Sequence, residues 1–148
     1  MTLGGRVAVM REGRIEQVDP PLQVYASPVN TFVARFIGVP PMNLLAGPVA
    51  ELQIPAGMTA GIRPHDIGIV PDGSIAATVD VIEPRGYDTI VHLRAAIGSG
   101  VSLVAVVADA PAVGDEVRLS IAGERVHFFG ADDRRIEGGF ADRTSHPR

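Results

Sequence analysis

From residue 40 onward the chain alternates short apolar segments with turn-forming residues, and this pattern limits the folds that it can adopt. In residues 89–94 and again in residues 116–121, inward-facing and polar side chains alternate, which predicts half-buried strands. Residues 102–107 (SLVAVV) are apolar almost throughout, so we expect this strand to be central in the sheet. Several such strands at short spacing predict an all-β unit, a small closed or nearly closed barrel that leaves few free edges.

Residues 1–38 follow another pattern, a hairpin followed by two short helices. Residues 6–10 and 14–18 are apolar-rich segments around a turn, in which Gly13 can adopt a positive φ. Proline at positions 20 and 28, after Asp19 and Ser27, predicts a helix start at each place.

The second of these helices carries a single apolar face that needs a partner surface. Its members recur at helical spacing: Val29, Phe32, Val33, Phe36 and Ile37. The partner is either the chain's own core or the body of a larger domain. A hairpin and two amphipathic helices at a terminus favour the second interpretation.

Composition excludes several kinds of chemistry. All thirteen basic residues are arginine, so no lysine is present for P-loop nucleotide binding or Schiff-base formation. The chain has no cysteine, which excludes disulfides and thiolate metal sites. It has no apolar run of about 20 residues and no secretory signal, so we expect a cytoplasmic protein. A net charge of −4 and the absence of tryptophan argue against a nucleic-acid partner.

The stretch GIRPHDIGI, residues 61–69, places a histidine beside an aspartate and invites a catalytic interpretation. That interpretation needs a nucleophile or a metal near His65. The histidines in the expected strands lie on other segments, so they are not placed beside it. We therefore interpret the stretch as a bend between strands. Arg63 would be an inward or edge arginine that ties strands together, Pro64 would end a strand, and Asp66 would accept hydrogen bonds from backbone amides at the bend.

Larger blocks of the sequence resemble a known family. The blocks, in order, are MTLGGRVAVMREGRIEQVDPPLQVYASPVNTFVARFIGVPPMNLL, GIRPHD, VIEPRGYDTIVHL and GDEVRLSIAGERVHFF. In this order and spacing they resemble the carboxy-terminal half of the ATPase subunit of maltose-type and glycerol-phosphate-type ABC importers. Two positions depart from the family pattern: Gly5 stands where aspartate is usual, and His65 where glutamate is usual.

The resemblance implies a domain organisation. Residues 1–38 would be the carboxy-terminal remnant of an ABC nucleotide-binding domain, residues 39–137 an OB-like TOBE regulatory domain, and residues 138–148 a flexible tail. The fold would be mainly β, an OB-like (TOBE/MOP-type) small barrel preceded by a hairpin and two short helices.

The same resemblance implies a function without chemistry of its own. The P-loop, signature motif, catalytic acid and switch histidine belong to the preceding domain of such subunits, so we expect no catalytic residue and no cofactor here; ATP and Mg²⁺ belong to the full-length subunit. The expected role is a regulatory and dimerisation domain of a sugar or polyol (glycerol-phosphate) importer. The alternative is a TOBE module that binds molybdate or tungstate.

Expected partners follow from this role. They are a second copy of the chain, the transporter membrane subunits through the ATPase domain, and a regulatory protein, with the complex at the cytoplasmic side of the membrane. Strand alternation at residues 126–129 places Val126 and Phe128 on one face and His127 and Phe129 on the other. If the first pair fills the core, Phe129 faces outward, unless the amino-terminal helices or the tail cover it. We predict that Phe129 anchors the homodimer.

Overall fold

The computed structural model describes residues 5–137, and its fold is mainly β. Strands make up 45% of the described residues and helices 16%, which confirms the predicted fold class. None of the described helices is long and apolar enough to span a bilayer. The elements are β1 Val7–Arg11, β2 Arg14–Asp19, α1 Pro21–Ala26, α2 Thr31–Phe36, β3 Asn43–Ala46, η1 Ala50–Leu52, β4 Thr59–Ile62, η2 Pro64–Asp66, β5 Ile67–Ile69, β6 Ile75–Pro84, β7 Thr89–Ala95, β8 Val101–Val107, β9 Glu116–Ile121, η3 Gly123–Arg125 and β10 His127–Phe129.

The hairpin β1–β2 forms as predicted, and Gly13 turns it with a φ of +76°. The second helix, however, begins three residues later than its proline indicated. The side chain of Asn30 accepts a hydrogen bond from the amide of Val33 at 2.9 Å and so caps α2. Val29 therefore lies outside the helix, where its side chain is exposed.

The predicted apolar face of α2 is only partly buried. Val33 is fully buried, whereas Phe36 is 62% exposed. Phe32 stacks on Phe36 with ring centroids 5.7 Å apart, so part of the apolar surface faces away from the chain's own core.

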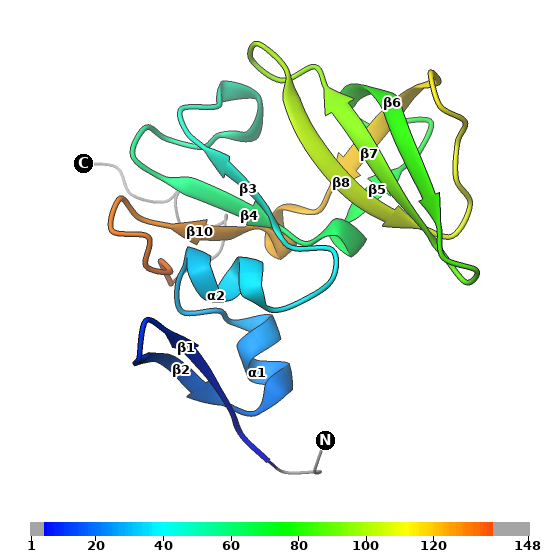
Figure 1. The fold of residues 1–148 in the computed structure, drawn as a ribbon. Helices are drawn as coiled ribbons and strands as arrows, with labels where there is room; N and C mark the ends of the chain where they lie inside the picture. Colours follow the sequence, from blue (N-terminus) through cyan, green and yellow to red (C-terminus); the bar gives the residue numbers. More distant parts are fainter. Residues whose placement is uncertain (1–4, 138–148) are drawn as a thin grey trace.

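Five antiparallel strands form the larger sheet, in the order β5-β9-β6-β7-β8. The sheet curls into a half-barrel (Figure 1). The predicted strand at residues 102–107 is β8, and its expected central place is wrong, because β8 ends the sheet. Its free edge is capped by Asn43, whose side chain accepts from Val104 N at 2.8 Å and donates to Val104 O at 2.9 Å. This capping and the contact with η2 allow an apolar strand to occupy an edge.

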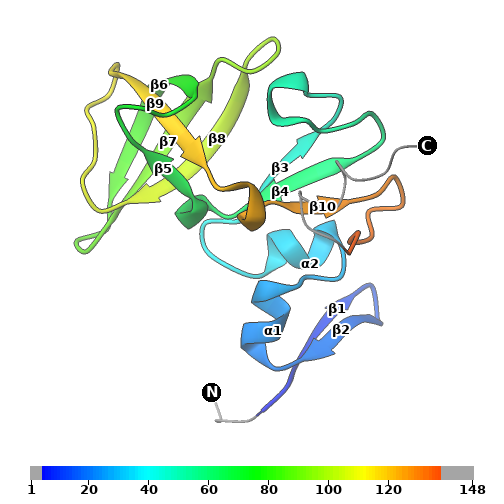
Figure 2. The same cartoon turned by 180° about the vertical axis from the view of Figure 1, so that it is seen from behind.

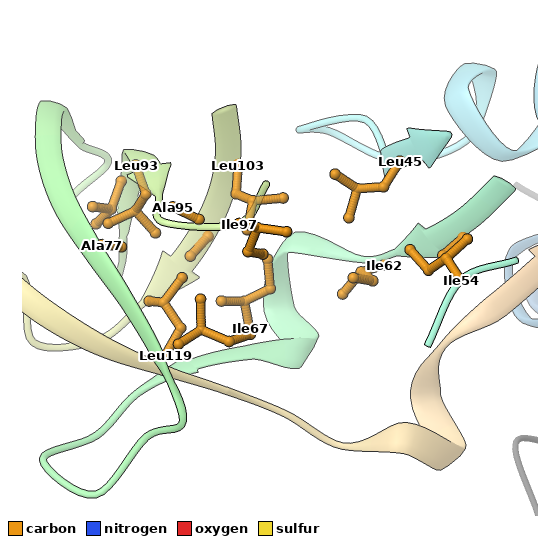
Figure 3. Packing of buried hydrophobic residues seen from close by; sticks show 14 of the residues in the cluster. Leu45, Ile54, Ile62, Ile67, Ala77, Leu93, Ala95, Ile97, Leu103 and Leu119 are labelled. Atoms are coloured by element: carbon orange, nitrogen blue, oxygen red, sulfur yellow. The ribbon is translucent and has the colours of Figure 1, made fainter. Parts of the chain in front are cut away.

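A second sheet of three strands, in the order β10-β4-β3, shares one core with the half-barrel. Figure 3 shows side chains of both sheets converging on this core: Leu45, Ile54 and Ile62 from the three-stranded side, and Leu93, Leu103 and Leu119 from the half-barrel. The inward residues of β7 are buried as the alternation predicts; in β9 Leu119 is buried, while Val117 and Ile121 are half-buried against the same core.

Helix α2 lies between the hairpin β1–β2 and the three-stranded sheet in both views (Figures 1 and 2). The chain after β10 returns to the start of this helix. Thr31 N donates to Asp133 O at 3.1 Å, and Arg135 N donates to Val29 O at 2.9 Å. The amino-terminal segment and the β-domain are therefore joined at a junction built from both ends of the described chain.

Candidate functional site

Arg63 lies at the centre of this junction, between β4 and η2. Its side chain reaches the backbone carbonyls of three residues in the helical segment. Nη1 donates to Ala34 O at 3.0 Å and to Ile37 O at 2.6 Å, and Nη2 donates to Tyr25 O at 2.9 Å. Carbonyls near a helix end lack intrahelical partners, so the guanidinium fork satisfies them. Arg63 takes the inward one of the two expected positions, but it ties helices rather than strands to the domain.

The charge of Arg63 is deeply buried. Only 3% of the residue is exposed, and its guanidinium carbon lies 4.1 Å from the centroid of the Tyr25 ring. Burial lowers the pKa of Arg63, while Tyr25 and Asp66 act in the opposite direction. Within residues 5–137, Nε has no hydrogen-bond acceptor and no carboxylate lies within ion-pair distance of this side chain.

The rest of the GIRPHD stretch makes a tight bend between β4 and β5. Pro64 is buried at the start of η2, His65 is exposed, and Asp66 N donates to Arg63 O at 2.9 Å. The Asp66 carboxylate lies 3.9 Å from Arg125 Nη1; the predicted hydrogen bond from a backbone amide to this carboxylate is not found in the described chain. No group of residues in the described part could hold a metal ion.

Phe129 is fully buried, so the prediction that its ring faces outward as a dimer anchor is wrong. The strand alternation itself is correct: Phe128 enters the main core and Phe129 points to the opposite face. That face is covered by Ala34 of α2 and by Met42. Gly61 makes room for this packing, because a Cβ there would contact Met42 Sδ and lie 3.0 Å from Phe129 Cε2.

His127 and Arg135 form a contact that the sequence did not predict. Arg135 Nη1 lies 2.6 Å from His127 Nδ1. Burial, and then the positive charges of Arg135 and Arg63, lower the pKa of His127 to about 4. The two side chains meet because Ile136 N donates to Phe128 O, which folds the chain back beside β10. The one sequence signal for this contact is the local HFFGADDRR pattern. It places a strand, a turn and two arginines in succession, as expected for a chain that folds back beside the strand.

Comparison with known families assigns the β-rich part of the chain. The family model described as the TOBE domain matches residues 60–129. Residues 60–129 are similar to a TOBE domain. The matched range includes the Arg63 bend, all of the half-barrel and β10, so this range contributes Arg63 and Phe129 to the junction.

Similar proteins extend the match across the amino-terminal segment. The chain is 36% identical over 153 residues to the sn-glycerol-3-phosphate import ATP-binding protein UgpC of Brucella abortus, covering 92% of this chain and 43% of the relative. It is 35% identical over 159 residues to UgpC of Vibrio vulnificus, with 92% and 42% covered. It is 37% identical over 162 residues to UgpC of Rhodopseudomonas palustris, with 91% and 44% covered.

The chain thus spans less than half the length of the curated relatives that it matches. These comparisons confirm the resemblance to a carboxy-terminal part of importer ATP-binding subunits.

Proposed function

We propose that this chain acts as the regulatory part of the ATP-binding subunit of a carbohydrate ABC importer and performs no ATP chemistry itself. The TOBE match and the relatives named as glycerol-3-phosphate import ATP-binding proteins support this role. The same relatives give less support to the molybdate or tungstate alternative.

One structural observation carries the proposal: the amino-terminal segment exposes apolar side chains that its own small cluster does not cover. The strongest examples are Met10, Ile15, Leu22 and Phe36, all more than half exposed. An apolar surface of this extent marks a contact with another protein surface. We infer that residues up to about 38 dock on the nucleotide-binding part of the subunit, and that residues 39–137 form the regulatory unit.

In this assignment ATP and Mg²⁺ bind to the nucleotide-binding part of the full-length subunit. The transported substrate is a sugar or polyol, with glycerol phosphate favoured by the names of the relatives. Partners are a second copy of the subunit, the membrane subunits and a regulatory protein. The complex would lie at the cytoplasmic face of the membrane.

A chimera tests the proposal. The matching part of the Vibrio vulnificus relative is replaced with this chain, and glycerol-3-phosphate uptake is measured in cells that lack their own ATP-binding subunit. We expect uptake to be restored by the chimera and not by the truncated relative. A folded chimera that hydrolyses ATP but supports no uptake would contradict a role in such an importer.

A second experiment uses calorimetry to test whether the chain alone binds ATP. Mg-ATP added to the isolated chain should give no saturable heat, because no lysine or P-loop is present. A one-site isotherm would overturn the assignment of ATP binding to another part of the subunit.

A further inference from the structure

A crevice of about 500 Å³ opens beside Arg63 at the junction. Its walls come from α1, η2, η3 and β10, and from the returning chain at residues 135–137. The acidic members lie at the rim: Glu124 is exposed, Glu137 is 88% exposed, and Asp66 lies 3.9 Å from Arg125. Arg63 is buried and Arg135 is half-buried, so the positive charge of two arginines lies in the floor, and the half-buried ring of His127 lies beside them.

The hydrogen-bond pattern fixes the state of His127. Arginine keeps its protons at any ordinary pH, so in the contact with Arg135 the Nδ1 atom of His127 must accept. The pKa of about 4 leaves the imidazole neutral near pH 7. A neutral imidazole that accepts at Nδ1 carries its proton at Nε2, which makes Nε2 a donor. In the described chain this atom has no hydrogen-bond acceptor.

Two more donors of the floor lack acceptors. Nε of Arg63 and Nε of Arg135 are both buried without a hydrogen-bond partner in the described chain. The carboxylate nearest to Arg135 Nε belongs to Glu137, at 3.6 Å, which is beyond hydrogen-bond distance. Buried donors without acceptors are costly, and so is the buried, unpaired charge of Arg63.

We propose that this crevice binds a small oxyanion, the carboxylate or phosphate group of a low-molecular-weight ligand. His127 Nε2 and Arg135 Nε donate to its oxygens, and Arg63 contributes its positive charge from below. The ligand displaces the exposed carboxylate of Glu137 from Arg135. Its position at the junction means that occupancy strengthens the link between the helical segment and the TOBE domain.

Nuclear magnetic resonance on the ¹⁵N-labelled chain tests this site directly, because arginine Nε–H groups and the histidine ring give separate signals. Inorganic phosphate and acetate are titrated separately at constant ionic strength, with chloride as the control anion. We expect saturable shifts of the Arg135 Nε and His127 Nε2 signals with at least one of the two probes. We also expect a rise in the pKa of His127, since a bound anion favours the imidazolium. The probe that saturates at the lower concentration identifies the preferred group.

Three variants provide the controls. Arg135→Gln should weaken binding at least tenfold, and its spectral dispersion shows whether it remains folded. Glu137→Gln removes the competing carboxylate and should tighten binding two- to fivefold without affecting the fold. Arg94→Gln, on an exposed arginine of β7, should leave binding unchanged. Shifts that do not saturate, that chloride reproduces, or that Glu137→Gln leaves unchanged would overturn the site.

Discussion

The half-barrel and the amino-terminal segment use similar apolar residues with opposite results. Sixteen buried residues form the core that the two β-sheets share, whereas the hairpin and helices bury three of their own, Val9, Val24 and Val33. Among the described residues, eight of the eleven exposed large apolar side chains belong to residues 10–39. The two regions therefore differ in how much of their apolar surface they bury within the chain, and not in the kind of apolar residue they contain.

The difference has a geometric cause. A curled sheet of five strands covers its inner face with its own residues, and the three-stranded sheet completes the cover. A two-stranded hairpin and two helices of six residues each are too small to enclose a core. The segment is held instead by contacts with the β-rich part, through Arg63 and Phe129, and apolar side chains on its outer side stay exposed.

The largest expected effect comes from removing the contact that joins the regions. Phe129→Ala should lower the free energy of unfolding by about 3–5 kcal/mol, because the ring is fully buried against Ala34 and Met42. Urea denaturation measures the loss. Phe129→Leu, which keeps most of the volume, should recover a large part of it. A cost below about 1 kcal/mol for Phe129→Ala would mean that the helix α2 does not pack here.

The Arg63 contact should have a smaller and more local effect. Arg63→Gln breaks the fork that binds three carbonyls, which we expect to cost about 2–3 kcal/mol. Hydrogen exchange should accelerate at least tenfold in α1 and α2, while the amides of the half-barrel change little. Arg63→Lys keeps the charge but not the planar fork, and should restore little protection. Equal acceleration throughout the chain would show that the regions unfold as one unit.

The sequence predicted the parts whose pattern is local. Alternation in residues 89–94 and 116–121 predicted two half-buried strands because each strand position faces one environment. The turn at Gly13 follows from one residue's conformational freedom. The edge position of β8 was not predictable in this way, because its cover comes from Asn43, sixty-one residues away from Val104.

The junction shows the same limit. The alternation in residues 126–129 correctly separated Phe128 from Phe129, but it could not show that α2 covers the second face. The sequence predicted two apolar surfaces without a partner, the face of the second helix and the ring of Phe129. The ring packs on Ala34 of α2, a residue that does not belong to the predicted face. No role was predicted for Arg135, which meets His127 only through the returning chain.

Acid should weaken the junction before it affects the half-barrel. The pKa of His127 falls from 6.5 to about 4 on folding, so the neutral ring stabilises the fold above pH 6.5, and this contribution is lost as the pH falls toward 4. The whole shift corresponds to about 3 kcal/mol, and solvent screening of the partly exposed ring reduces this to about 1–2 kcal/mol. Urea denaturation at pH 7 and pH 4.5 measures the change.

A matched variant isolates this contribution. His127→Gln can still accept from Arg135 but does not titrate, so its stability should fall less between the two pH values. Carboxylates whose pKa is also lowered, such as Asp88, contribute equally to both proteins and cancel in the difference. The same slope in both would show that His127 is not the group responsible.

The smallest effect is expected at Phe36 of α2, the same residue type as the fully buried Phe129. Phe36→Ser should change the free energy of unfolding of this chain by no more than about 0.5 kcal/mol, because the ring is 62% exposed and makes one stacking contact, with Phe32. In the chimeric subunit the same substitution should cost more, since the ring would then lie against the nucleotide-binding part. Thermal unfolding of both proteins, each with and without the substitution, gives the four values needed.

A loss above about 1.5 kcal/mol in the chain alone would show that the segment already buries this ring. An equal and small loss in both proteins would remove Phe36 from the docking surface, and the exposed apolar face would then have to contact another partner.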